Sequence, residues 1–498
     1  MKTLIPRKFR TLPALIGAPL IGATLLAGCM VGPDFHRPDA PKNNRYTVQP
    51  MPATIGQDGD AQHLVAGMDV PAQWWTLFQS RQLDALVKQS LKANPGLVAA
   101  QAALRQAQEA EAAGKGALYP TVTADYNVSR QRIAGTLASP AASGYDYYTL
   151  HTAQLSVSWA PDLFGGNRRQ LEALRAQTDV QRFELDAARL SLTSNVAVAA
   201  IQQAGLRAQV EATRKIIASQ QETLDSFQRQ LRLGQLALAD VAAQQATLAQ
   251  TQATLPPLQK QLDQQNDALA ALLGVAPADA QVPAFDLADL HLPGQLPLNL
   301  PSQLVAQRPD VRAAEAQLHA ASAQVGVAEA NRLPKFTLSA NAGSAPTDIG
   351  NLFKDGTVFW NLAADVSQPL FDAGSLKHQQ RAAEAALDAA KAQYRGTVIA
   401  ALQNVADTLY ALKADADALR AAQIAEQAAQ RSLDINRRQF DLGDVNRLAV
   451  LQAEQAWQQT EIMLVQAQAA RYSDTAALFQ ALGGGWWQNQ HDRETSAK

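Results

Sequence analysis

Few side chains in this sequence have the type and spacing that catalysis requires. No glycine-rich phosphate loop, His-Glu zinc pattern or nucleophile elbow is present. The seven histidines are scattered without the spacing of a metal site, and surface or structural roles fit them best: His36, His63, His151, His291, His319, His378 and His491. The sequence therefore predicts no enzyme activity, no catalytic residue and no metal site.

One residue does have the surroundings for a specific covalent modification. Cys29 is the only cysteine, and it follows Leu26-Ala27-Gly28, a pattern that resembles the bacterial lipobox, in which the cysteine is lipidated and becomes the first mature residue. Basic residues and an apolar run precede it, so residues 1–28 are interpreted as a signal peptide. We predict an N-acyl and S-diacylglycerol lipid on Cys29 and no other cofactor. An ordinary signal peptide with an incidental cysteine is the alternative.

Composition and charge restrict the possible partners. The chain has 43 basic and 45 acidic residues and a formal net charge of -2, so it lacks the basic face that a nucleic acid partner would need. Beyond residue 28 no apolar run reaches the roughly 18 residues of a spanning helix, so a membrane crossing would need strands. Met30 stands where an Asp would favour retention in the inner membrane, which leaves the outer membrane open as a destination.

The mature sequence contains one pattern twice, about 210 residues apart. Each copy has two Leu-Gly pairs in the same order, Leu233-Gly234 and Leu273-Gly274 in the first, Leu442-Gly443 and Leu482-Gly483 in the second. A period of this length indicates a duplicated domain. We expect a lipidated extension at 29–80, repeat 1 at 81–275, a linker at 276–301, repeat 2 at 302–485 and a tail at 486–498.

Each copy should contain a helix, a strand, a loop, a strand, a very long helix, a turn and a helix. The first helix should run from Gln82 to Leu118 and its counterpart from Ser302 to Leu333, because a proline follows soon after each. Alternating apolar and polar residues predict four strands with one apolar face, at 121–130, 153–159, 336–342 and 360–367. Polar residues on the other face and aromatic residues at the strand ends favour a membrane sheet with a wet lumen over a soluble sheet.

The two hairpin loops, at 133–146 and 343–357, are rich in turn-forming residues and should be flexible turns that face outside. Four strands cannot close a barrel, and open edges cannot remain unpaired in lipid, so the chain must form an oligomer. Two copies would give about eight strands and a filled barrel, whereas three would give about twelve strands and a lumen.

A helical stretch of about 67 residues, roughly 100 Å long, follows the second strand of each copy. Pro256-Pro257 interrupts only the first copy, so a bend is expected there, and the Pro-rich segment from Ala276 to Pro301 is expected to be a surface connection. Apolar residues with a seven-residue spacing indicate a coiled-coil seam in both long helices: Val210, Ile217, Leu224 and Leu231, then Leu419, Leu433 and Phe440.

With these features in order, the chain resembles the outer membrane factor family, the TolC-like ducts, and in particular its NodT-type lipoprotein branch in efflux pumps. The likeness covers essentially the whole mature chain. Beyond the repeat, it rests on residues 29–35, which read Cys-Met-Val-Gly-Pro-Asp-Phe, on Trp74-Trp75 before Leu83, and on the paired tips Arg232-Leu233-Gly234 and Asp441-Leu442-Gly443.

The resemblance implies a mixed fold, a trimeric twelve-stranded transmembrane β-barrel with four strands per chain, continuous with a long periplasmic α-helical barrel. It implies a passive exit duct for small molecules, the outer-membrane channel of a tripartite efflux pump, lipid-anchored and extending into the periplasm. The implied partners are two further copies in a homotrimer, outer-membrane lipid, a periplasmic adaptor protein and a proton-driven inner-membrane transporter.

The resemblance also assigns roles to residues at the periplasmic tips. Asp240 matches an acidic position of the gate that closes the pore. The second copy departs from the family, with Ala449 and Gln452 where relatives often carry Asp, so Asp444 and Arg447 are predicted as gate residues beside Gln452. Three symmetry-related carboxylates would repel one another, which gives a physical basis for a gate. Four residues match the turns where adaptor hairpins dock: Leu233, Gly234, Leu442 and Gly443.

Two other functions remain open at this stage. A TolC-like duct for protein secretion would have the same architecture and a different inner-membrane partner, although the lipobox favours efflux. A lipid-tethered coiled-coil scaffold in the periplasm would account for the long helices but not for the four amphipathic strands. The sequence does not identify the transported substrate.

Overall fold

The computed structural model describes residues 30–42, 44–132 and 147–487. Cys29, the predicted signal peptide, the first hairpin loop and residues 488–498 lie outside the described residues. The chain divides into two compact units. The strand unit comprises Met1–His36, Ala107–Thr178 and Gln317–Lys391, and the helical unit comprises Arg37–Gln106, Asp179–Ala316 and Ala392–Lys498.

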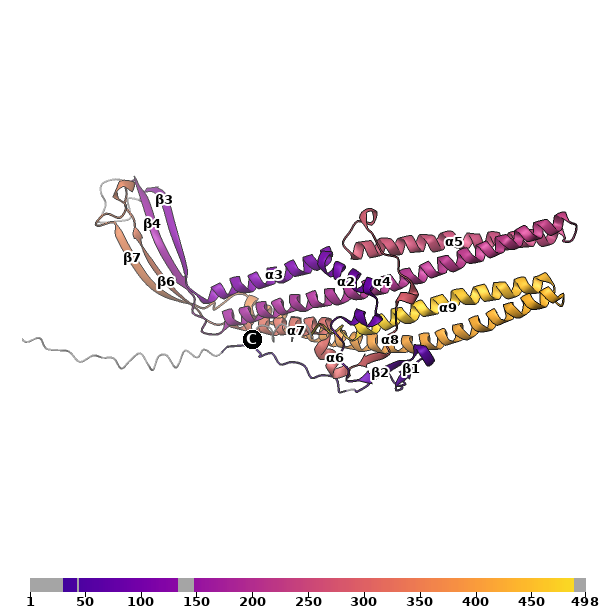
Figure 1. The fold of residues 1–498 in the computed structure, drawn as a ribbon. Helices are drawn as coiled ribbons and strands as arrows, with labels where there is room; N and C mark the ends of the chain where they lie inside the picture. Colours follow the sequence, from indigo (N-terminus) through magenta and orange to yellow (C-terminus); the bar gives the residue numbers. More distant parts are fainter. Residues whose placement is uncertain (1–29, 43, 133–146, 488–498) are drawn as a thin grey trace, which may run out of the picture. The chain divides into compact units, whose positions relative to one another are not determined.

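Each copy of the repeat contributes one very long helix and one of about half that length. Helix α4 (Gly166–Arg232) has 67 residues and is followed by α5 (Leu238–Leu272) with 35. Helix α8 (Ser375–Leu442) has 68 residues and is followed by α9 (Arg447–Ala481) with 35, and Figure 1 shows α5 beside α4 and α9 beside α8. The predicted long helices are confirmed. None of the helices in the described ranges is long and apolar enough to cross a membrane.

The predicted coiled-coil seam is present near the ends of these helices. Leu224 and Phe227 of α4 are buried against Val241 and Leu248 of α5, and Ile217 and Leu231 pack on the same cluster. In the second copy, Leu433 of α8 is buried against Val450 and Ala453 of α9, with Phe440 at its margin. Apolar residues one turn or two turns apart therefore join each long helix to the helix that follows it.

The helices that open each copy are broken, which the sequence reading missed. Instead of one helix from Gln82, the chain forms α2 (Arg81–Ala93), α3 (Pro95–Lys115) and the short 3-10 helix η4 (Gly116–Leu118). Instead of one helix from Ser302, it forms α6 (Pro301–Gln307) and α7 (Pro309–Ala330). Each break falls directly before a proline, because proline pushes the preceding residue out of the helical region. Asn94 and Arg308 accordingly have extended ψ angles of 121° and 127°.

Helix α5 continues as one helix through Pro256 and Pro257, so these prolines do not end it, and the expected bend there stays a prediction. Each proline removes one backbone donor and leaves one carbonyl of the preceding turn without its helical partner. Both prolines are exposed, as are Gln252 and Ala253, the residues four positions earlier whose carbonyl groups are released. Water can therefore bind the released carbonyl groups, and the packed cluster near the tip still fixes the start of the helix.

Four strands form a single antiparallel sheet in the strand unit, in the order β3 (Thr121–Arg132), β4 (Tyr147–Trp159), β6 (Lys335–Ser344) and β7 (Val358–Ser367). All four predicted strands are confirmed. The loop between β6 and β7 contains the 3-10 turn η7 (Ile349–Asn351), where the Asp348 carboxylate accepts a hydrogen bond from the Gly350 N–H at 2.7 Å.

The strand register places the apolar residues of all four strands on one face. Val122 lies opposite Val157, which lies opposite Ala340, which in turn lies opposite Leu362. The next row of paired residues is polar and lies on the other face of the sheet. It consists of Thr123, Ser156, Asn341 and Asn361. On the apolar face Val122, Leu362 and Val366 are more than 60% exposed, so nothing in the described part of the chain buries these side chains.

A second, small sheet joins the N-terminal extension to the linker between the copies. Strand β1 (Thr54–Ile55) pairs antiparallel with β2 (Gln62–Ala66), and β2 pairs in parallel with β5 (Gln295–Leu298) of the linker. The linker is therefore more than the surface connection predicted from its prolines, since three of its apolar side chains are buried: Phe285, Leu290 and Leu296. A strand this short gives almost no periodic signal in a sequence.

Candidate functional site

The tips of the two long hairpins have the same backbone geometry. In the first, the N–H of Gln235 donates to the Gln230 carbonyl at 2.9 Å and Gly234 has a φ of 72°. In the second, the N–H of Asp444 donates to the Gln439 carbonyl at 2.9 Å and Gly443 has a φ of 82°. Both are Schellman caps, in which glycine adopts the left-handed conformation that a Cβ disfavours. The backbone of both tips therefore favours glycine at these two positions.

Each tip carries two exposed leucines. Leu233 and Leu238 flank the first turn and are 72% and 69% exposed, and Leu442 and Leu448 flank the second and are 77% and 58% exposed. Large apolar side chains left in water at neighbouring positions are typical of surfaces that contact another protein. The sequence singled out Leu233 and Leu442, but Leu238 and Leu448 lie outside the short Leu-Gly motif.

The four predicted gate residues do not form one cluster within the chain. Asp240 lies in the first turn of α5, Asp444 lies in the turn before α9, and Gln452 lies in α9; all three are exposed. The carboxylates of Asp240 and Asp444 make no ion pair with any residue that the structure describes. Arg447, at the start of α9, instead lies over the ring of Phe440, 5.2 Å from its centroid.

Arg447 lines a polar pocket near the tips that the sequence reading missed. The pocket lies among α4, α8 and α9, and the Ser219 hydroxyl of α4 donates a hydrogen bond to Glu454 of α9. Arg437 of α8 is within 3.8 Å of the same carboxylate. The other charged residues that line this pocket are Glu222, Asp225, Arg229 and Asp441. These residues lack any common spacing, so only the packing of three helices could reveal them.

An apolar stripe runs along the outside of α8 without any partner in the described part of the chain. Ile399, Tyr410, Ile424 and Ile435 are each about half exposed. Successive members are separated by 11, 14 and 11 residues, close to whole numbers of turns at about 3.6 residues per turn, so all four lie on one side of the helix. Such a stripe is the usual sign of a helix that packs against another helix.

A buried charge cluster joins α8, α9 and the N-terminal extension in the helical unit. The Arg471 side chain is fully buried and donates hydrogen bonds to the carbonyl groups of Leu412 and Ile55. Burial, a hydrogen bond with Asp474 and the charge of that residue raise the pKa of Asp415 to about 7, although Arg471 opposes this shift. Burial also lowers the pKa of Arg471, while Asp415, Asp60 and Asp474 act against that shift.

The sequence matches a known protein family over most of its length. Residues 86–275 and 300–484 match the family described as "Outer membrane efflux protein". The pyoverdine export outer membrane protein OpmQ of Pseudomonas putida is 30% identical over 420 residues, which cover 83% of this chain and 88% of that protein.

Solved structures have the same fold. The outer membrane protein VceC of Vibrio cholerae is 28% identical with a TM-score of 0.76, and the match covers 84% of this chain and all of that one. The MtrE outer membrane channel of Neisseria gonorrhoeae is 26% identical with a TM-score of 0.79, over 92% of this chain and 99% of that one. The chain therefore belongs to the outer membrane efflux protein family, and it is an efflux channel protein of the outer membrane and not an enzyme.

Proposed function

We propose that three copies of this chain form a twelve-stranded barrel continuous with an α-helical barrel, the exit duct for small molecules in a tripartite efflux pump. The observation that carries this proposal is the uncovered apolar face of the four-stranded sheet. Strands β3 and β7 pair on one side only, so each copy offers two open edges. Lipid does not tolerate unpaired backbone groups, so these edges must pair between copies. About twelve strands leave a water-filled lumen, whereas about eight are filled by side chains.

The stripe on α8 supports the same oligomer outside the membrane. A soluble helix does not leave Ile399, Ile424 and Ile435 in water without a cost, because each exposed apolar side chain loses the free energy of burial. A neighbouring copy is the partner that would cover this face along its whole length. The stripe therefore contributes to the contact between chains in the α-helical barrel.

The pore is gated at the tips by Asp240, Asp444, Arg447 and Gln452. Asp240 and Asp444 are exposed and are free to meet their symmetry-related copies around the pore axis. Carboxylates at short range repel one another unless a cation or an arginine separates them. Arg447 is three residues after Asp444 and Gln452 is five residues further along α9, so both lie near enough in the sequence to supply that contact.

A periplasmic adaptor protein docks at the tips, and a proton-driven transporter of the inner membrane supplies the energy. The support comes from the exposed leucines, Leu233 and Leu238 at one tip and Leu442 and Leu448 at the other. Gly234 and Gly443 hold each turn tight, so the leucines are presented at the ends of the hairpins. Cys29 carries the lipid anchor and lies outside the described residues.

Single-channel conductance in planar lipid bilayers tests the gated duct. We expect wild type to show small, mostly closed currents, and Asp240→Ala combined with Asp444→Ala to raise the open fraction clearly. The matched control is Asp263→Ala combined with Asp267→Ala, which removes two exposed carboxylates from α5 away from the tip and should behave as wild type. No current from any of the three proteins, despite proven insertion in the bilayer, would exclude the channel.

A further inference from the structure

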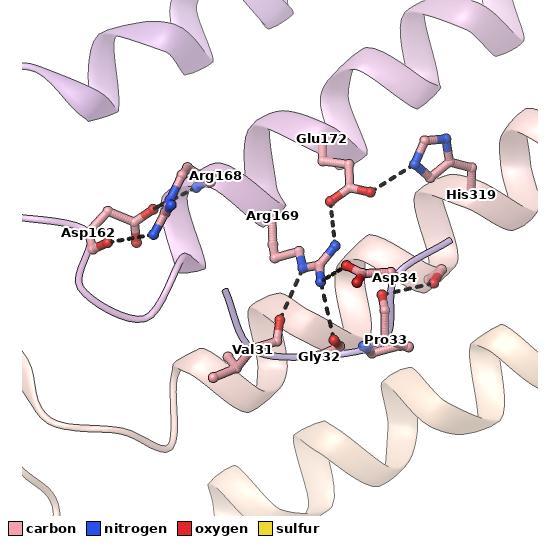
Figure 2. Close-up of polar contacts among 10 residues, drawn as sticks. Val31, Gly32, Pro33, Asp34, Asp162, Arg168, Arg169, Glu172 and His319 are labelled. Carbon is pink, nitrogen blue, oxygen red and sulfur yellow. Dashed lines mark hydrogen bonds and ion pairs between the residues drawn. The ribbon is translucent and has the colours of Figure 1, made fainter. Parts of the chain in front are cut away.

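A buried arginine in the strand unit binds the segment that follows Cys29, here named the N-terminal strap (Met30–Phe35). The Arg169 side chain is only 1% exposed, although it lies near the start of α4. Its Nε–H donates to the Val31 carbonyl at 3.0 Å, and its Nη2 donates to the Gly32 carbonyl at 3.2 Å (Figure 2). One guanidinium therefore satisfies two successive backbone carbonyl groups of the strap.

The same guanidinium is held by two carboxylates. Nη2 of Arg169 lies 2.7 Å from Oδ1 of Asp34 in the strap, and Nη1 lies 2.8 Å from Oε2 of Glu172 in α4. Burial alone would disfavour the cation, but the hydrogen bonds with Asp34 and Glu172 outweigh burial and raise the pKa of Arg169. Arg169 is thus charged and fully engaged. A lysine could not reach these groups at once, because it offers a point charge in place of a planar fork.

A histidine from α7 completes this site. His319 Nε2 is hydrogen-bonded to Oε1 of Glu172 at 2.8 Å, which fixes the carboxylate that holds Arg169. The ring of Phe35 stacks on the His319 ring, with centroids 4.3 Å apart and planes inclined by 14°. The strap therefore contacts α4 through Arg169 and α7 through His319, and Figure 2 shows Arg169 directed at the strap on one side and at Glu172, the partner of His319, on the other.

Glycine backbones let the strap approach closely enough for these contacts. Gly32 has a φ of 89°, and a Cβ placed on it would lie 2.3 Å from the Cα of Gly326 in α7. A Cβ on Gly326 would lie 2.9 Å from the Val31 carbonyl oxygen. At the other end of the strap, the N–H of Val31 donates to the Phe164 carbonyl at 3.1 Å, in the corner between β4 and α4. The strap backbone is therefore held against α7 at Gly32 and against the corner before α4 at Val31.

We propose that Arg169, Glu172, His319 and Gly326 form an internal docking site for the N-terminal strap, which fixes the attachment point of the lipid anchor beside the corner between β4 and α4. This inference rests on the proposed lipidation of Cys29. Met30 is bonded to Cys29 and lies against Gly165 of that corner, so the site that holds the strap also positions the acylated residue. The anchor then enters the lipid next to the base of the membrane sheet. Arg169 is a positioning residue, and the strap is its ligand.

Amide hydrogen exchange of the full-length acylated protein tests the docking. We expect the Val31 amide of wild type, which donates to the Phe164 carbonyl, to be protected. Its exchange should rise by about a hundredfold in Arg169→Gln and by about tenfold in Asp34→Asn, because each substitution removes charge-assisted hydrogen bonds that hold the strap. Arg175→Gln, in the same helix with a side chain 59% exposed, is the matched control and should leave the strap protected. Equal exchange in wild type and both strap variants would overturn the proposal.

Asp34→Asn keeps the test decisive if Arg169→Gln fails to fold, since the Asp34 side chain is 74% exposed and lies outside the helices. A second readout follows the attachment point itself. A spin label on Cys29 of the unacylated mature chain, its only cysteine, should give an immobilised spectrum in wild type and a mobile one in Asp34→Asn. A mobile label in wild type would also overturn the proposal.

The proposed function is tested separately on the same preparation. Intact mass reports acylation of Cys29, and bilayer recording reports the channel. An unacylated Cys29 or an absent conductance would contradict the proposed function, whereas exchange of the strap amides does not require either property. Failure of the docking site and failure of the channel therefore give different results.

Discussion

Arg447, the first residue of α9, lies over the ring of Phe440 in the last turn of α8, with its guanidinium carbon 5.2 Å from the ring centroid. The contact spans the tip turn and holds the arginine against its own hairpin. In the proposed gate this contact fixes the arginine three residues after Asp444, which lies in the tip turn before α9.

Replacing Phe440 by leucine should loosen the gate. A cation above an aromatic ring at an exposed site contributes about 0.5–1 kcal/mol, so loss of the ring should raise the open fraction by roughly two- to fivefold. Single-channel recording measures this directly. Phe183→Leu is the matched control, because that ring also lies under arginine side chains but is far from the tip in the sequence. An unchanged open fraction in Phe440→Leu would show that Arg447 acts without the ring.

Gly396 within α8 and Gly443 just after its end should respond in opposite directions to alanine. Gly443→Ala should destabilise the tip by about 1–2 kcal/mol, because its φ of 82° disfavours a Cβ. Gly396→Ala should stabilise by about 0.5–1 kcal/mol, because this residue lies within the helix and a Cβ would meet no atom within 4 Å. Amide exchange of residues 439–446 and chemical denaturation report the two changes. If the amides of residues 439–446 exchange no faster in Gly443→Ala than in wild type, the positive φ of Gly443 does not require glycine.

Stability should fall as the pH rises toward neutrality. The pKa of Asp415 is raised from 3.8 to about 7 in the folded chain, so between these values the folded state binds a proton that the unfolded state has released. Stability from this group is therefore fully present below about pH 4 and is lost as the pH rises through about 7. Asp415 shares this proton with Asp474, so the titration step belongs to the two carboxyl groups together.

Thermal melting between pH 5 and pH 8 checks this dependence. Asp415→Asn keeps the uncharged form at every pH and should flatten the fall in melting temperature over that range. Asp417→Asn removes an exposed carboxylate that pairs with Lys413 on the same helix, so it should leave the fall unchanged. Arg471 and Asp60 face the pair as well, and a fall that persists in Asp415→Asn would assign the titration to one of the other acids.

The α8 stripe should control assembly. Ile424→Glu places a charge in the middle of the stripe and should weaken the oligomer at least about tenfold, because an unpaired charge in an apolar contact costs several kcal/mol. Ile424→Leu keeps the apolar volume and should assemble as wild type. Mass photometry in detergent over a dilution series measures both. Trimers of equal stability in the two variants would mean that this face of α8 lies outside the contact between copies.

Much of this protein was determined by the sequence itself, because its strongest signals are local. Alternation over about seven to ten residues identified all four strands, the seven-residue spacing identified the helical seam, and the Leu-Gly pairs identified tips that do adopt Schellman caps. Prolines were less informative. Pro95 and Pro309 break helices whereas Pro256 does not, since the outcome depends on what surrounds each residue. The proposed gate residues came from family resemblance, and among them Arg447 alone contacts an aromatic ring or an opposite charge within the residues that the structure describes.

Only the tertiary structure decided which distant residues meet. Asp34 and Arg169 are separated by 135 positions, and β2 pairs with a linker strand more than 200 positions away. Neither contact leaves a periodic pattern, because a single pair or a four-residue strand is too short to show one. The strand register likewise joined four local apolar faces into one continuous face. Periodicity predicts each helix or strand separately. Packing decides which elements lie against each other, because those contacts join residues far apart in the sequence and leave no local pattern.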